Sequence, residues 1–165
     1  ILIMKYKIYL YVTLKIIKVS IDIHLEIIEN LGLKIKTKEK QELKEALEIA
    51  EKLYEANKID DDTVNKYAKK IESEIIDYHY MRKKNKKEVK VYSYEKMANL
   101  LPDNFLDSFH SIYLPALYIK DKLLLTIKKE NIEKEFNIML EKIDKHCKYI
   151  EDNYLDKFYE EAKVE

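Results

Sequence analysis

The stretch that decides the fold is ENIEKEFNIMLEKIDKHCKYIEDNYLDKFYEEA, which runs from Glu130 to Ala162. Its apolar residues follow each other at steps of three or four, which places them on one side of a single long helix. They are Ile132, Phe136, Met139, Ile143, Cys147, Ile150, Tyr154 and Phe158. At a rise of 1.5 Å per residue the helix is about 50 Å long. We therefore expect it to support shorter elements or to reach a partner, with Ile150, Tyr154 and Phe158 as the candidate partner interface.

Two further parts of the chain have helical patterns. Residues 37–81 carry two apolar stripes separated by a short polar link, which predicts an antiparallel helical hairpin. Residues 93–162 are expected to hold the C-terminal helices. Within them the segment from Phe105 to Ile127 is the most apolar, and we predict it to be the central element, kinked or restarted at Pro115. Residues 82–92 lose the apolar stripe and are predicted to be a basic linker.

The N-terminal segment, residues 1–31, has a different pattern. From Lys5 to Ile16 apolar residues alternate with lysines and polar or aromatic residues, which is typical of a half-buried strand. The alternation resumes out of phase at Ile17, so residues 17–31 are either more strand or a helix. As a helix they place His24 inside the apolar arc. We expect a strand from 5 to about 19 followed by a helix from about 21 to 31.

Composition excludes several classes of protein. The 165 residues carry 31 basic and 31 acidic side chains, so there is no general charge attraction for nucleic acid or anionic membranes. Gly32 is the single glycine, and phosphate-binding loops and nucleophile elbows need more than one. One cysteine cannot form an internal disulfide, which suits a reducing, cytoplasmic compartment. No charge-free run is long enough to span a membrane.

No set of residues has the spacing of a catalytic or metal site. Asp22, His24 and Glu26 alternate, but side chains two apart on a strand lie about 7 Å from each other. Asp107 and His110 lie one helical turn apart, which fits a local ion pair better than a di-metal site. His146 and Cys147 are adjacent, so on a helix they point about 100° apart. We expect no catalytic residue, no bound metal and no cofactor.

Two basic features favour a nucleic-acid contact as an alternative. The strand's polar face interleaves lysines with tyrosines, as single-strand-binding surfaces do, and the linker adds more positive charges. The candidate contacts are Lys5, Lys7, Tyr9, Tyr11, Lys15, Arg82, Lys83, Lys84, Lys86 and Lys87. An edge strand protected by lysines and an exposed linker explain the same residues without any ligand.

Taken together, the sequence predicts a mainly α, single-domain helical bundle over residues 1–165. It has four to six helices, a long C-terminal helix and an N-terminal β-strand or hairpin. The predicted function is a small non-enzymatic protein that binds a protein partner or itself, since an isolated strand needs a pairing partner. A nucleic-acid-associated protein is the alternative, and a helical-bundle metalloprotein using Asp107 and His110 is the third reading.

Overall fold

The computed structural model describes residues 2–30, 35–85, 104–124 and 132–155, and these are almost entirely helical. The α-helices are α1 (Leu2–Asn30), α2 (Thr37–Ala56), α3 (Asp61–Asn85), α5 (Phe105–Tyr118) and α6 (Ile132–Ile150). Two single turns of π-helix continue the chain, η1 (Ile119–Leu123) after α5 and η3 (Glu151–Leu155) after α6. The mainly α bundle is therefore confirmed.

The predicted N-terminal strand is wrong, because residues 2–30 form the single helix α1 and no strand occurs in the described ranges. The helical period was present alongside the alternation. Leu10, Leu14, Ile17, Ile21 and Ile28 follow each other at helical steps and are fully buried. Residues 9–14 are buried all round the helix, and in such a segment β-branched alternation carries no information about a solvent face.

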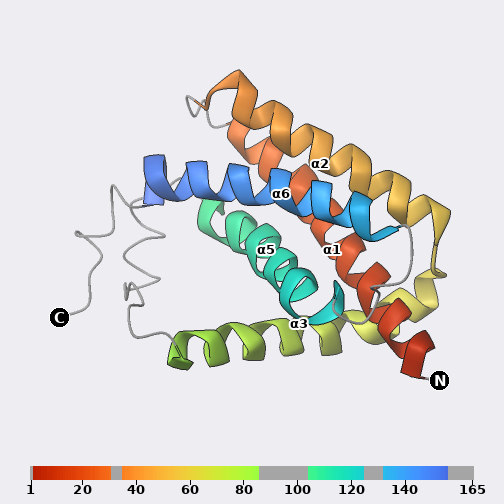
Figure 1. Cartoon of the computed structure of the whole chain (residues 1–165). Helices are drawn as coiled ribbons and strands as arrows, with labels where there is room; N and C mark the ends of the chain where they lie inside the picture. Colours follow the sequence, from red (N-terminus) through yellow and green to blue (C-terminus); the bar gives the residue numbers. More distant parts are fainter. Residues whose placement is uncertain (1, 31–34, 86–103, 125–131, 156–165) are drawn as a thin grey trace.

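Helix α1 is the element on which α2, α3 and α5 pack. In Figure 1 it runs diagonally through the molecule, with α2 above it, α5 beside it, α3 below it and α6 crossing it. The closest packing pairs are α2 with α6 and α1 with α5, and α1 also lies against α2 and α3. The segment from Phe105 was expected to be central, but in the structure α5 shares this role with α1.

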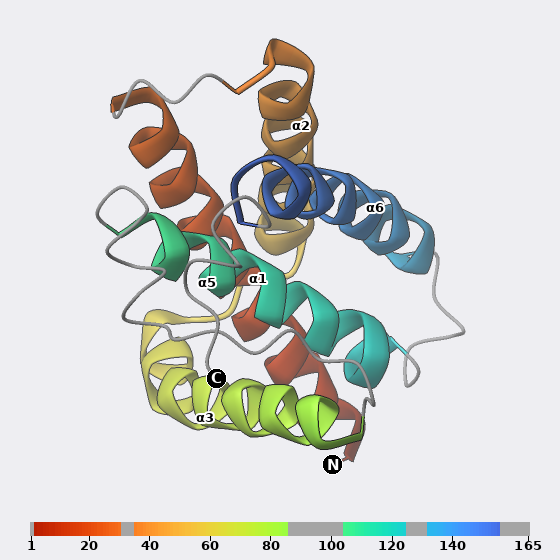
Figure 2. The ribbon, with the colours of Figure 1, turned by 90° about the vertical axis from the view of Figure 1, so that its left-hand side faces the viewer.

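The two helices of residues 37–81 form where the sequence predicts them. They do not pack along each other as a simple hairpin would. Figures 1 and 2 show α2 and α3 on opposite sides of α1. Helix α2 buries Leu43, Ala46 and Ala50 against α1 and α6, whereas α3 packs on α1 and α5. Helix α3 also continues to Asn85, so the first residues assigned to the basic linker are helical.

The C-terminal stripe is confirmed, but it faces the interior. Phe136, Met139, Ile143, Cys147 and Ile150 are all buried, and α6 lies between α2 and α5. Lys142 on its polar side forms ion pairs with Glu42 and Glu45 of α2. Helix α6 is therefore a member of the core, and its expected continuation over residues 156–162 lies outside the described residues, as do residues 86–92 of the linker.

Candidate functional site

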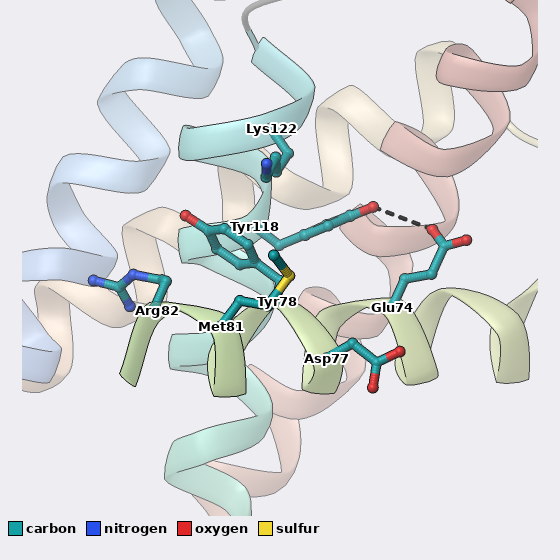
Figure 3. A pocket seen from close by; sticks show the side chains of 7 residues that line it. All are labelled: Glu74, Asp77, Tyr78, Met81, Arg82, Tyr118 and Lys122. Carbon is teal, nitrogen blue, oxygen red and sulfur yellow. Dashed lines mark hydrogen bonds between the residues drawn. The ribbon is translucent and has the colours of Figure 1, made fainter. Parts of the chain in front are cut away.

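A hollow of about 500 Å³ opens between α3 and the α5–η1 junction, and we call it the tyrosine hollow (Figure 3). The rings of Tyr78 and Tyr118 meet edge to face there, 5.9 Å between centroids. Figure 3 shows Arg82 on one side of these rings and the carboxylates Glu74 and Asp77 on the other. Its wall also includes Met81 and Lys122. The hollow therefore combines an aromatic wall with charges of opposite sign at its two ends.

Each tyrosine hydroxyl in this hollow donates to a carboxylate. Tyr118 donates to Glu74 Oε2 at 3.3 Å, and Tyr78 donates to Asp121 Oδ2. Burial and the nearby carboxylates raise the pKa of both tyrosines to about 12. Both phenols are thus held neutral at physiological pH.

The π-turn η1 positions the cationic side of the tyrosine hollow. A π-turn inserts one extra residue into a helix and re-aims the side chains around it, and such turns are frequent at functional sites. Here it places Asp121 Oδ2 3.9 Å from Arg82 Nε and Lys122 Nζ 5.3 Å from the centre of the Tyr78 ring. Arg82 and Lys122 are therefore held beside the tyrosines by one carboxylate and one aromatic ring.

A second hollow, of about 450 Å³, lies on the other flank of α3, and we call it the apolar hollow. Its walls come from α1, α3 and α5 and include Ile16, Ile75, Ile76 and Leu114. Asp107 and His110, the pair singled out in the sequence, are also among its lining residues. Both residues therefore border an apolar surface.

Exposed apolar side chains gather on α1 and α3, two of the three helices that line this hollow. Six large apolar side chains are exposed among the described residues, namely Val19, Ile23, Ile76, Tyr80, Met81 and Ile138. Only Ile138 lies outside α1 and α3. Met81 lines the tyrosine hollow and Ile76 lines the apolar hollow. The outer face of α3 between the hollows, with Ile76, Tyr80 and Met81, is called the α3 face below.

A polar cluster that the sequence did not reveal lies in the core. His24 of α1 and His146 of α6 are fully buried, with their Nε2 atoms 3.2 Å apart. Burial, and then the neighbouring His146, lower the pKa of His24 to about 3. Burial lowers the pKa of His146 to about 4, although its contact with the Glu39 carbonyl acts in the opposite direction. Both imidazoles are thus neutral at physiological pH.

Of the residues proposed for nucleic-acid binding, those whose side chains the structure describes do not form one exposed surface. Tyr9 and Tyr11 are buried, so their rings are closed to a nucleic-acid base. Lys15 pairs with Asp61 at 3.6 Å, and Arg82 lies in the tyrosine hollow. Lys5 and Lys7 are exposed on α1. The remaining candidates are Lys83 and Lys84, which lie on α3 but whose side chains are outside the description, and Lys86 and Lys87, which lie outside the described residues altogether.

The three residues of the candidate partner interface at the C-terminal end also differ in where they lie. Ile150 is fully buried within this chain. Tyr154 is partly buried, and its ring packs on that of Phe105 at 6.2 Å between centroids. Phe158 lies outside the described residues. The side chains of Ile150 and Tyr154 therefore serve the packing of α6 and η3.

No group of three or more histidine, cysteine or acidic side chains in the described ranges has the arrangement of a metal site. Asp22 and Glu26 are exposed on α1, whereas His24 points into the core. Within the part of the chain that the structure describes, no helix has the length and apolar character needed to cross a membrane.

Comparisons with known proteins return nothing that resembles this chain: no family model matches it, and neither a curated protein nor a solved structure does.

Proposed function

We propose that the protein is a small interaction protein that binds another polypeptide chain, most simply a second copy of itself, through the α3 face. The observation that carries this proposal is the exposure of Ile76, Tyr80 and Met81, at 49, 62 and 63%, between two hollows. Isolated exposed apolar residues are common, but a group beside a concave surface is typical of a contact site.

The charges along α3 favour a second copy as the partner. Asp77 precedes the exposed Tyr80 and Met81, and Lys83 and Lys84 follow them in the sequence. Two α3 helices that cross antiparallel near Tyr80 bring the helix position of Asp77 in each copy opposite that of Lys83 in the other. A two-fold interface has this property, because the same patch meets itself in reverse order. The apolar side chains then lie at its centre and the charges at its rim.

The tyrosine hollow supports the same proposal. Its ends carry opposite charges, so a bound segment with one acidic and one basic side chain finds a partner for each. The aromatic wall supplies the type of contact that contributes most binding energy at protein interfaces. The side chain of Lys122 lies over the Tyr78 ring and is already placed for a carboxylate.

Replacing Tyr80 by Glu is the direct test. Because Tyr80 lies next to the two-fold axis of an antiparallel α3 pair, the two introduced carboxylates face each other and lose their hydration, so we expect self-association to weaken at least about 30-fold. Sedimentation equilibrium over a range of protein concentrations measures the effect. Ile138→Glu, which changes an exposed isoleucine on α6, is the matched control and should sediment like the unchanged chain. An unchanged chain that stays monomeric at high concentration would rule out self-association through α3.

A further inference from the structure

The buried histidines belong to a continuous row of polar contacts that joins four helices. His146 Nδ1 lies 3.0 Å from the Glu39 carbonyl oxygen of α2. The two Nε2 atoms lie 3.2 Å apart, and His24 Nδ1 lies 2.8 Å from Ser108 Oγ of α5. Ser108 Oγ in turn lies 2.9 Å from the Phe105 carbonyl oxygen. There are thus four hydrogen-bond contacts in series, and each needs one hydrogen.

A count of hydrogens shows that the neutral row is one short. Both ends of the row are carbonyl oxygens, which only accept. Neutral His24, neutral His146 and the Ser108 hydroxyl supply one hydrogen each, three for four contacts. The arrangement that satisfies every ring nitrogen has His146 donate from Nδ1 to Glu39, His24 donate from Nε2 to His146, and Ser108 donate to His24 Nδ1. The contact between Ser108 and the Phe105 carbonyl then has no hydrogen.

We propose that this row is a binding site for a single proton, which enters at His24 Nδ1 while the Ser108 hydroxyl turns from His24 to the Phe105 carbonyl. The proton comes from solvent and no bond between heavy atoms changes. His24 Nδ1 then donates to Ser108 Oγ, Ser108 donates to Phe105, and the other two contacts keep their direction. All four contacts hold a hydrogen only when the row carries this one added proton, whichever of the two rings holds the hydrogen between the Nε2 atoms.

The groups packed around His24 and His146 do not carry the charge of the added proton, so that charge rests on the two imidazoles. Helix α2 contributes the backbone carbonyl of Glu39, and α5 contributes Ser108 and the ring of Phe105, 5.5 Å from that of His24. On α6 the neighbour is Cys147, whose buried thiol has a raised pKa. The acidic groups Asp144 and Glu151 act on Cys147, and Tyr154 of η3 packs on Phe105. Among the described residues, His146 is the one titratable group whose charge changes the pKa of His24.

Burial sets the pH at which the first proton enters, and the short distance between the two rings prevents a second proton from entering. Moving a cation into an apolar interior costs more than one added hydrogen bond returns, so the pair is neutral at pH 7. A second proton would place two imidazolium rings with their Nε2 atoms 3.2 Å apart, both as donors. The folded protein therefore takes up one proton at this row as the medium becomes acidic, and its excess charge belongs to the pair.

Ring-nitrogen NMR of the ¹⁵N-histidine-labelled full chain tests the proposal. At pH 7 we expect a hydrogen on Nδ1 of His146 and on Nε2 of His24. On acidification one proton appears at His24 Nδ1 while circular dichroism still reports the folded state. If unfolding comes first, the pattern at pH 7 still tests the proposal, because a hydrogen already present on His24 Nδ1 at pH 7 would leave that nitrogen unable to accept the proton. A hydrogen on Nε2 of His146 at pH 7, two protons taken up by the folded chain, or a stoichiometric metal on the purified protein would overturn the proposal.

Ser108→Ala is the variant that separates this role from simple packing. It removes the donor to neutral His24 and also the acceptor of the protonated ring. A lost hydrogen bond costs more when the group is charged, so proton uptake should move about one pH unit lower. Ser111→Ala is the matched control, since Ser111 Oγ donates to the Asp107 carbonyl one turn further along the same helix, away from the histidines. An unchanged uptake midpoint in Ser108→Ala, with the fold intact, would show that Ser108 takes no part.

Discussion

Lowering the pH from 6.5 to 5 will reduce the free energy of unfolding by about 3 kcal/mol, because over this range two buried histidines take up protons in the unfolded chain and stay neutral in the folded one. Burial lowers the pKa of His24 to about 3 and that of His146 to about 4, against an ordinary value of 6.5. Between pH 6.5 and 4 the unfolded chain therefore binds more protons than the folded one. The stability that these rings contribute is present above pH 6.5 and is lost as the pH falls towards 4.

Urea unfolding at half-unit pH steps measures this loss, with an expected slope of about 2.7 kcal/mol per pH unit for two protons. A chain with His24→Leu and His146→Leu should lose that slope whatever its absolute stability. His110→Gln is the control, since His110 borders the apolar hollow and is only partly buried. A wild-type slope equal to that of the double variant would contradict this account of the core.

Phe109→Ala will lower the free energy of unfolding by about 3–5 kcal/mol. Phe109 is 2% exposed and lies on the face of α5 that packs into the core, where its ring stacks on Tyr113 at 5.6 Å between centroids. Truncation removes the ring from an interior that α1, α3 and α6 also build, and the cavity left behind is only partly refilled.

Chemical denaturation of the variant and the unchanged chain measures this difference. Ile138→Ala is the comparison, because Ile138 is exposed on the outer side of α6 and should change the stability by about 0.5 kcal/mol or less. Equal effects of the two substitutions would place Phe109 outside the core.

The C-terminal part of the fold could be predicted because its sequence has one period only. The stripe from Phe136 to Ile150 matches helical spacing and has polar residues elsewhere, so it identifies both the element and its buried side. The same holds for α2, whose Leu43, Ala46, Ala50 and Leu53 are buried as the stripe predicts. Within the segment that begins at Phe105, which the sequence predicts to be central, Phe109 and Leu124 are buried and Leu117 is partly buried.

The N-terminal part was not predictable in the same way, because α1 is buried on nearly all sides between residues 9 and 14. There the sequence shows apolar and β-branched residues without a polar face to indicate the period. Ile and Val have a preference for strands, but packing against α2, α3 and α5 outweighs it. The steps between Leu10, Leu14, Ile17 and Ile21 were the signal for a helix.

The histidine row and the tyrosine hollow could not be predicted from local sequence patterns, for a different reason. His24 and His146 are 122 positions apart, and only the packing of α1 beside α6 brings them together. The tyrosine hollow likewise brings Tyr78 together with Tyr118 and Asp121 at the π-turn η1. No sequence motif predicts this turn. One expectation did follow from local spacing: with residues 21–31 helical, His24 falls inside the apolar arc, and it is buried.

The most direct test of the proposed α3 interface is disulfide formation at its centre. In a Cys147→Ala background, Tyr80→Cys places one thiol close to the two-fold axis, and a disulfide needs Cα atoms about 4.4–6.8 Å apart. The account predicts rapid formation of a covalent dimer under mild oxidation at dilute protein, with Ile138→Cys remaining monomeric. Equal and slow cross-linking of the two variants would contradict the claim that one copy of α3 lies against another.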